Sequence, residues 1–527
     1  MSRFRLSFIT FLALSLLAAD FQIILADTLR MVYPLPPVSL DPQRYPPDPA
    51  AWPVIMTSYK RLFDLKPGTT ELDNTDSAAT TYRISDDGLI YTILLREGQT
   101  FSDGSPVDSY AALFTFDRLM SSETGRVYFG PLRFLEIVGP YTFRFRLDRP
   151  WAPFISALTT PMASLISPGL ATKSTGFLDR RTLGSGRFEA ELVDDSSLTM
   201  KIRADSATIP KLDRVEFFFE PDEAQRVRVM VEKEAHLAWG TAASAGDNYL
   251  TLSVPTFETK FVAFNLARPY LKLDGIREAI SLLISAAFAG QKEYRVAGFG
   301  PAGLLPGFDP GPAANVDPIE SRQRAAEILT RVGPTRVPLD LVYWTDDPAG
   351  RQDAEILAAS LSAGGLSVRL VPLSGNHGRG ILEKRDFDLL LDRRRPWLPS
   401  PEMWLGGFLD SRSSIDGNPA GFTDSAADSL IAEMSTVDRA ERDRVLKRLT
   451  NLALDQRPYK MIYQKPLNIV VDQRLAGLKP HPMWPEVWPV ESVNLDPFKP
   501  KVQVLVPEPP QGPLIKSFDH PVAEPYE

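Results

Sequence analysis

Residues 81–120 constrain the fold of this chain more than any other stretch, because they join a strand pattern, a turn and a helix pattern in a fixed order. Apolar residues alternate with other residues over 91–95, the two-residue period that is typical of a strand with one buried face. Asp-Gly and Ser-Pro pairs in 101–106 favour a turn. Asp108 is then placed to cap a helix whose apolar residues follow. Periodicity alone predicts a strand-turn-helix unit, which any α/β domain can contain.

The order of these residues resembles the signature of family 5 of the extracellular solute-binding proteins, the peptide, opine and nickel receptors of ABC importers. Five further blocks resemble the same family, in the family's order along the chain: residues 28–44, 183–203, 211–239, 261–285 and 422–471. The resemblance spans residues 28–495 in all. It implies an α/β fold of the two-lobed periplasmic binding protein type (type II), with an extra subdomain in the first lobe and mixed sheets flanked by helices.

The resemblance also implies a division of the chain. The expected parts are a signal peptide at 1–26, a first-lobe core at 27–55, 176–264 and 468–495, an extra subdomain at 56–175, a second lobe at 265–467, and a proline-rich tail at 496–527. Strand and helix patterns alternate between residues 321 and 392, which predicts a mostly parallel sheet in the second lobe. We place the boundary between the lobes near Asn265.

The N-terminus has the pattern of an export signal. Two arginines precede an apolar run over residues 8–19 that is too short to span a bilayer of about 30 Å. We expect cleavage after Ala26, with cleavage after Ala19 or an uncleaved anchor as alternatives. The chain has no cysteine, which excludes disulfides, thiolate sites and a lipidated N-terminal cysteine. An exported, untethered receptor of this family is expected in the periplasm of a Gram-negative cell.

Two further features bear on partners. The net charge of -8, without a basic stripe, makes nucleic acid an unfavourable partner. The tail after residue 495 contains eight prolines, which disfavours packed helices and central strands. We expect it to lie outside the core, and the alternative is a contact through 502–506. The resemblance implies a monomer that works with a separate ABC permease and ATPase.

Residues for catalysis or cofactor binding are not arranged in recognisable patterns. The four histidines are scattered, without metal-ligand spacing. Gly184, Ser185 and Gly186 lack the spacing of a nucleophile elbow and fit a turn. The glycines at 298, 300 and 303 have dinucleotide spacing, but they follow a helix rather than a strand. We therefore predict no catalytic residues, no cofactor and no metal site.

A binding site leaves weaker traces than catalysis, since it needs only polar anchors and aromatic walls at lobe-facing strand ends. The segment 387–405 is the main candidate. It contains planar arginine side chains suited to carboxylate or phosphate and tryptophans suited to stacking: Arg393, Arg394, Arg395, Trp397 and Trp404. Candidates by position alone are Trp239, Phe257, Asn265 and Trp344. The alternative is that the arginines form a solvated turn and the tryptophans pack in the core.

One departure from the family bears on the solute. In peptide-binding members, a carboxylate shortly before an Asp-Pro pair anchors the free ammonium of the peptide. Counting back from Pro401 places Trp397 at that position. Because an unpaired buried ammonium is strongly unfavourable, we expect a solute with an acidic group or a blocked amine.

The sequence thus predicts a periplasmic solute-binding protein of an ABC importer, which encloses a peptide-like or acidic solute between two lobes and performs no chemistry. Two alternatives stay open at this point. One is an exported periplasmic hydrolase on the same α/β shell, and the other is a chaperone or sensor outside transport.

Overall fold

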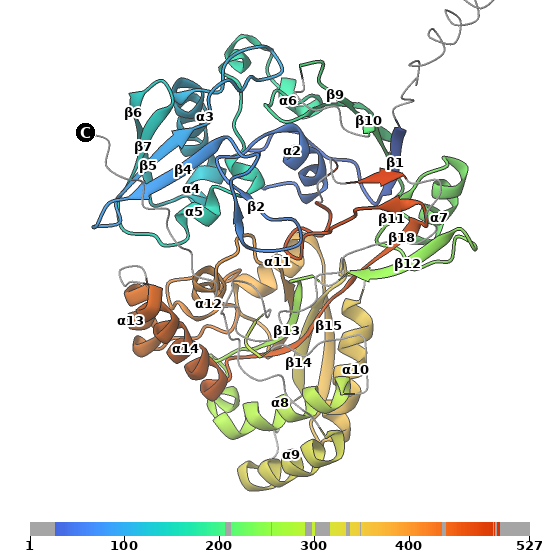
Figure 1. The fold of residues 1–527 in the computed structure, drawn as a ribbon. Helices are drawn as coiled ribbons and strands as arrows, with labels where there is room; N and C mark the ends of the chain where they lie inside the picture. The colour runs from blue at the N-terminus through green and yellow to red at the C-terminus, as the bar shows by residue number, and fades with distance from the viewer. Residues whose placement is uncertain are drawn as a thin grey trace, which may run out of the picture.

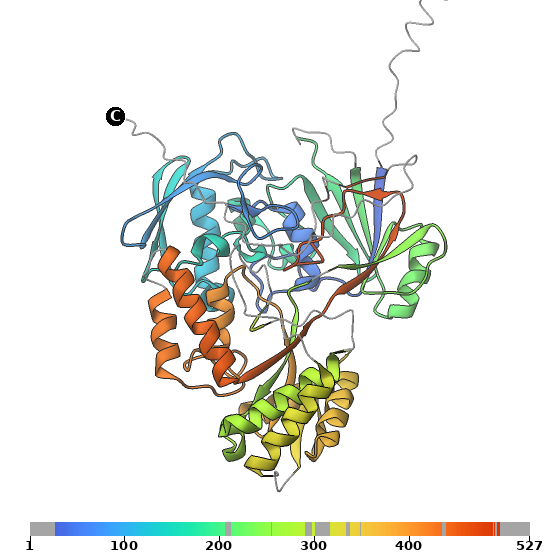
Figure 2. The same cartoon turned by 60° about the horizontal axis from the view of Figure 1, so that its bottom comes forward.

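The computed structural model describes most of the chain, and three sheets organise it (Figures 1 and 2). The described residues are 27–205, 212–254, 256–289, 298–300, 317–333, 338–347, 349–434, 439–487, 490 and 493–495. The predicted signal peptide, the proline-rich tail and Gly303 lie outside them.

A seven-stranded sheet forms the core of the upper right part of Figure 1, in the order β12-β18-β11-β1-β10-β9-β8. Its strands are β1 Asp27–Tyr33, β8 Phe188–Asp194, β9 Ser197–Ile202, β10 Leu212–Phe219, β11 Leu237–Trp239, β12 Tyr249–Val254 and β18 Leu467–Asp472. Strand β1 is central and runs parallel to β10 and β11. Its apolar residues Leu29, Met31, Val32 and Tyr33 are all buried, as expected of a strand in the middle of a sheet. Helices α2 (Trp52–Ser58) and α7 (Glu223–Glu232) pack beside this sheet.

A four-stranded antiparallel sheet, β4-β5-β7-β6, forms the extra subdomain, and its predicted strand and helix are confirmed. The elements here are β4 Ala79–Ile84, β5 Ile90–Leu95, β6 Leu132–Gly139, β7 Thr142–Leu147, α3 Ser109–Ser121, α4 Glu123–Tyr128 and α5 Phe154–Ala157. Asp108 caps α3 by accepting hydrogen bonds from the N–H groups of Tyr110 and Ala111. The alternating residues Tyr91, Ile93 and Leu95 of β5 are buried in its core.

A five-stranded sheet, β15-β14-β16-β13-β17, forms the core of the lower part of Figure 1. Its strands are β13 Thr259–Phe264, β14 Leu339–Trp344, β15 Val368–Leu373, β16 Leu389–Arg394 and β17 Tyr459–Gln464, and its helices are α8 Asp274–Phe288, α9 Pro318–Val332, α10 Gly350–Ala363, α11 Gly375–Glu383, α12 Pro401–Leu409, α13 Ser425–Met434 and α14 Arg439–Gln456. Helices α8, α9 and α10 share one apolar core with the sheet, and α11 to α14 contribute to another.

Short elements complete the fold. They are the two-stranded pairs β2 Asp64–Leu65 with β3 Leu72–Asp73 and β19 Leu475–Ala476 with β20 Asn494–Leu495, together with α6 Phe177–Arg180, η1 Pro49–Ala51, η2 Pro161–Ala163, η3 Pro168–Thr172 and η4 Pro269–Lys272.

The five-stranded sheet departs from the sequence expectation in two respects. Only β15, β14 and β16 are parallel, whereas β13 pairs antiparallel with both β16 and β17. By this pairing β13 belongs with the second lobe, although the predicted range 176–264 leaves it with the first. The chain changes sheet before Thr259 rather than near Asn265. The remaining domain ranges stay a prediction.

The predicted turn at Gly184–Gly186 packs against the end of α2. Gly186 N–H donates to the carbonyl of Ser58 at 2.9 Å. A Cβ atom on Gly186 would lie 2.2 Å from the carbonyl oxygen of Thr57, which is backbone and has little freedom to move. Only glycine therefore fits this contact, and the turn role predicted for the segment is consistent with it.

We expect Gly186→Ala to lower the free energy of unfolding by about 1–3 kcal/mol, the usual effect of forcing an extra carbon into a packed site. Gly139→Ala is the matched control, because no atom lies within 4 Å of its added Cβ. Urea denaturation followed by tryptophan fluorescence measures both. Equal stability of the two variants would contradict the packing described for the turn.

Candidate functional site

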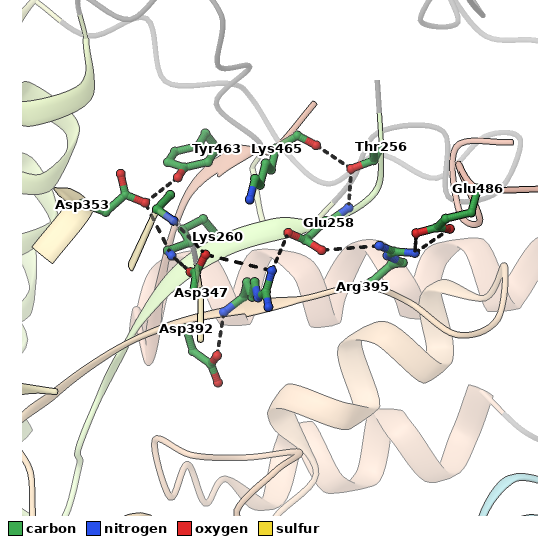
Figure 3. A network of polar contacts seen from close by, with 12 residues as sticks. Thr256, Glu258, Lys260, Asp347, Asp353, Asp392, Arg395, Tyr463, Lys465 and Glu486 are labelled. Carbon is green, nitrogen blue, oxygen red and sulfur yellow. Dashed lines mark hydrogen bonds and ion pairs between the residues drawn. The ribbon is translucent and has the colours of Figure 1, made fainter. Parts of the chain in front are cut away.

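The chain passes twice between the seven-stranded and five-stranded sheets, and these two crossings lie side by side. The first joins β12 to β13 through residues 255–258, and the second joins β17 to β18 through 465–466. Lys465 N–H donates to the carbonyl of Glu258 at 2.8 Å, and the Thr256 hydroxyl donates to the carbonyl of Lys465 at 2.5 Å. The crossings therefore form one bonded pair of segments between the lobes (Figure 3).

A buried ion cluster adjoins the crossings on the side of the five-stranded sheet. Lys260 on β13 is 3% exposed and pairs with Asp347, and its Nζ lies 3.5 Å from Asp353. The hydroxyl of Tyr463 on β17 donates to Asp353 at 2.5 Å. The segment after β14 and helix α10 thus each bring one carboxylate to Lys260, and β17 holds the second of them through Tyr463 (Figure 3).

Burial acts differently on the two carboxyl groups. Burial alone would raise the pKa of Asp347, but the hydrogen bond and charge of Lys260, with help from Arg393, hold that pKa below its usual value. Burial raises the pKa of Asp353, and the Tyr463 hydroxyl and Lys260 offset the rise only in part. Lys260 is therefore bound more closely by Asp347 than by Asp353. The cluster contains one strong ion pair, Lys260 with Asp347, and one weaker interaction, Lys260 with Asp353.

We expect Lys260→Met to destabilise the protein by about 3–5 kcal/mol, because it leaves buried carboxylates without their cation. Combining it with Asp347→Asn should restore much of the loss. The control is Arg351→Met, since Arg351 and Glu355 form a solvent-exposed pair whose removal should change stability by less than about 1 kcal/mol. Thermal unfolding measures all three. A Lys260→Met protein as stable as the control would refute the cluster's structural role.

Charged side chains continue from this cluster toward the first lobe. Arg393 Nη1 lies 3.6 Å from Glu258 and 4.0 Å from Asp347. Arg395 lies 3.6 Å from Glu258 and donates to both oxygens of Glu486, at 2.8 and 3.0 Å. We call Glu258, Arg393, Arg395, Lys465 and Glu486 the charged seam.

The charged seam lies against the first lobe. The carbonyl of Glu486 accepts a hydrogen bond from the hydroxyl of Tyr33, at the end of β1. Phe257 N–H donates to the carbonyl of Pro482 at 2.8 Å. The seam therefore connects the end of β16, the first crossing and the segment that follows β18.

The three predicted arginines have different surroundings. Arg394 lies 3.7 Å over the ring of Phe408 and donates to the carbonyls of Asp416 and Gly417. Burial lowers its pKa. Arg393 and Arg395 point to the other side, because successive residues of a strand alternate in direction. The structure brings Arg393 and Arg395 together in the seam and separates Arg394 from them.

The predicted tryptophans are mostly packed. Trp404 is 3% exposed, and its indole N–H donates to the carbonyl of Phe299 at 2.9 Å. Trp239 is 1% exposed and its ring lies 5.5 Å from that of Tyr33. Trp397 is half-buried and meets Tyr128 of α4 edge to face at 4.8 Å. Of the three, Trp397 has the most accessible side chain, and it lies where the second lobe contacts the extra subdomain.

The other positional candidates lie in different places, and Asn265 follows the end of β13 that is farther from Glu258. Asn265 is fully buried, and its amide donates to the carbonyls of Arg385 and Phe387. Phe257 is buried within the first crossing, and Trp344 is half-buried at the end of β14. Sequence reasoning missed Glu258, Lys465 and Glu486, which come from segments without a motif.

A separate cavity of about 170 Å³ lies within the first lobe, between the end of α2, the β2–β3 hairpin and the segment 479–487. Several of its charged side chains already have partners: Lys60 and Arg187 pair with Asp76, and Arg61 pairs with Asp64. Burial lowers the pKa of His481 to about 4, so this ring is neutral near pH 7. None of the described residues that line this cavity belongs to the range predicted for the second lobe, so we do not assign the cavity to the solute.

Asp392 adds a titratable group beside the seam. Burial raises the pKa of its carboxyl to about 6, against the opposing effects of the Arg393 N–H and nearby cations. A carboxyl group whose pKa is raised in the folded state contributes most to folding stability below its unfolded-state pKa of about 3.9. This contribution is lost as the pH rises through the folded-state pKa.

We therefore expect Asp392→Asn to raise stability relative to the unmodified protein at pH 7.5, on the order of 1–2 kcal/mol, and to change it little at pH 4. Asparagine keeps an oxygen that can accept from the Arg393 N–H and lacks the buried charge. Chemical denaturation at both pH values measures the difference. A stability gap that stays constant between them would show that Asp392 does not titrate as described.

Neither a metal site nor a membrane helix is found in the part of the chain that the structure describes. No group of three or more His, Asp or Glu side chains there is arranged to hold a metal ion. No described helix combines the length and apolar character needed to pass through a bilayer.

Comparison with known proteins identifies the family. The profile of "Bacterial extracellular solute-binding proteins, family 5 Middle" matches residues 75–415. The chain is 24% identical over 486 residues to the probable D,D-dipeptide-binding periplasmic protein DdpA of Escherichia coli, covering 86% of this chain and 92% of that protein. It is 25% identical over 256 residues to the glutathione-binding protein GsiB of Salmonella paratyphi A, covering 45% and 49%. These relatives are named as binding proteins rather than enzymes.

Solved structures confirm the predicted fold. HbpA2 of Haemophilus parasuis superimposes with a TM-score of 0.77 at 19% identity, over 89% of this chain and all of that one. The two-lobed α/β architecture with mixed sheets flanked by helices is thus shared with this protein. The chain therefore belongs to family 5 of the bacterial extracellular solute-binding proteins, and its role is to bind a substrate in the periplasm.

Proposed function

We propose that the protein encloses a peptide-like solute bearing an acidic group at the charged seam and delivers it to an ABC permease driven by a separate ATPase. Arg393 carries the proposal. Among the described residues its guanidinium makes no hydrogen bond, and its two ion pairs are long, at 3.6 and 4.0 Å. A guanidinium with free donors beside a junction between lobes is suited to a carboxylate, which accepts two parallel N–H bonds.

The surrounding charges support an acidic solute. Arg395 is already bound by Glu486 (Figure 3), and Lys465 acts together with Arg393 as a cation on the carboxyl group of Asp347. Trp397 leaves the family's usual ammonium anchor without a carboxylate, although Glu258 and Glu486 lie elsewhere in the seam. A solute with a free amine therefore fits the structure better than the sequence suggested. The acidic group of the solute becomes the main determinant of binding.

The relatives support the peptide-like part of the proposal. DdpA is named for D,D-dipeptides and GsiB for glutathione. Both kinds of molecule are small peptides that carry at least one carboxylate. The identity levels near 25% leave the solute of this chain to experiment.

The proposal includes the state of the protein in the cell. Residues 1–26 act as a cleaved export signal, and the chain without cysteine stays untethered in the periplasm. It works as a monomer and releases its solute chemically unchanged. In this proposal four of the predicted residues hold the fold and do not contact the solute: Arg394, Asn265, Trp239 and Trp404. Three others remain candidate walls of the site: Trp397, Trp344 and Phe257.

We expect native mass spectrometry of gently purified protein to reveal a bound small molecule, and Arg393→Ala to weaken its binding at least about tenfold. Loss of a hydrogen bond to a charged group is worth about 1.5–3 kcal/mol, which corresponds to that factor or more. Arg412→Ala is the control, because Arg412 is exposed and pairs only locally with Asp410. Isothermal titration with the identified solute measures both variants.

Unchanged affinity in Arg393→Ala would refute the assignment of Arg393 as the anchor. A retained molecule without any acidic group would refute the proposed solute class. A change in mass of the solute during incubation with the protein would favour the hydrolase alternative.

A further inference from the structure

Glu258 occupies an unusual position in the charged seam. One oxygen of its carboxylate lies 3.6 Å from Arg393 and the other lies 3.6 Å from Arg395. Its side chain is 15% exposed. Both distances exceed that of a hydrogen bond, so the carboxylate attracts two guanidinium groups without binding either one closely.

The two arginines depend on Glu258 to different degrees. Arg395 has Glu486, which accepts from it at 2.8 and 3.0 Å. Among the described residues, the other carboxylate that pairs with Arg393 is Asp347, at 4.0 Å, and Asp347 is already paired with Lys260. Glu258 is therefore the main counter-charge of Arg393.

The backbone of Glu258 is fixed independently of its side chain. Its N–H donates to the Thr256 hydroxyl at 3.0 Å, and its carbonyl accepts from Lys465 N–H at 2.8 Å. The first bond lies within one crossing and the second joins the two crossings, and neither involves the carboxylate, which points toward Arg395 (Figure 3). The side chain can thus change rotamer while the crossings stay bonded.

We propose that Glu258 is a specificity-determining residue whose carboxylate competes with the acidic group of the solute for Arg393. This inference rests on the proposed function, because it assumes that Arg393 receives that group. An incoming acid must displace Glu258 or share Arg393 with it, and the like charges repel. Small anions gain too few other contacts to overcome this repulsion, so the residue selects larger solutes that also bind elsewhere.

The competition predicts that removing the charge of Glu258 strengthens the binding of a simple acid. We choose trifluoroacetate as the probe, since ¹⁹F nuclear magnetic resonance detects its weak binding to the intact protein. Glu258→Gln should bind trifluoroacetate at least about fivefold more tightly than the unmodified protein, within the range measured for coupled neighbouring charges. The double variant Glu258→Gln with Arg393→Ala should lose this gain.

Glu355→Gln is the matched control, because Glu355 also pairs with an arginine but is solvent-exposed, and its partner is Arg351 rather than an arginine of the charged seam. It should leave trifluoroacetate binding unchanged. Glu258→Ala provides a second removal of the charge, and thermal unfolding of every variant reports folding.

Unchanged or weaker trifluoroacetate binding in folded Glu258→Gln and Glu258→Ala proteins would overturn the inference. A gain that persists without Arg393 would overturn it as well. Failure of the proposed function appears elsewhere, as unchanged affinity of the retained solute in Arg393→Ala. The two failures are therefore distinguishable.

Discussion

The pair of crossings between the two main sheets is the constraint on which the rest of the structure depends. The described strands connect the sheets only through 255–258 and 465–466, and these segments are hydrogen-bonded to each other. Any change in the angle between the lobes must therefore be absorbed at or near them. Residues beside the crossings respond to that angle more directly than residues elsewhere, and the charged seam lies there.

Charge balance explains how so many ionic groups are accommodated near this junction. Lys260 is compensated by Asp347 on one side, and Arg395 is compensated by Glu486 on the other. Arg393 lies between these closed pairs and keeps donors that no described side chain accepts. The side chain of Arg393 is 35% exposed, so water can reach the spare donors until an acid arrives and accepts charge-assisted hydrogen bonds from them. The charged groups that stabilise the junction between the lobes are therefore next to the arginine that is proposed to bind the solute.

Local patterns predicted much of the fold. The alternation in β5 and the cap of α3 are encoded within a few residues, so both were predictable. The place where the chain passes from one sheet to the other was not predictable. All six residues of β13 are buried, so their pattern does not indicate which sheet the strand joins.

For the site, the sequence identified the three arginines at the end of β16, and strand alternation explains why Arg394 faces Phe408 instead of the seam. Glu258 and Glu486 were missed because their proximity is created by tertiary structure alone. The most direct test of the whole account measures lobe closure, and the absence of cysteine allows clean labelling at Arg126→Cys in α4 and Arg444→Cys in α14. Single-molecule energy transfer should show a broad range of separations in solute-free protein and a shift to shorter ones at saturation with the retained solute. An unchanged distribution under saturating solute would contradict it.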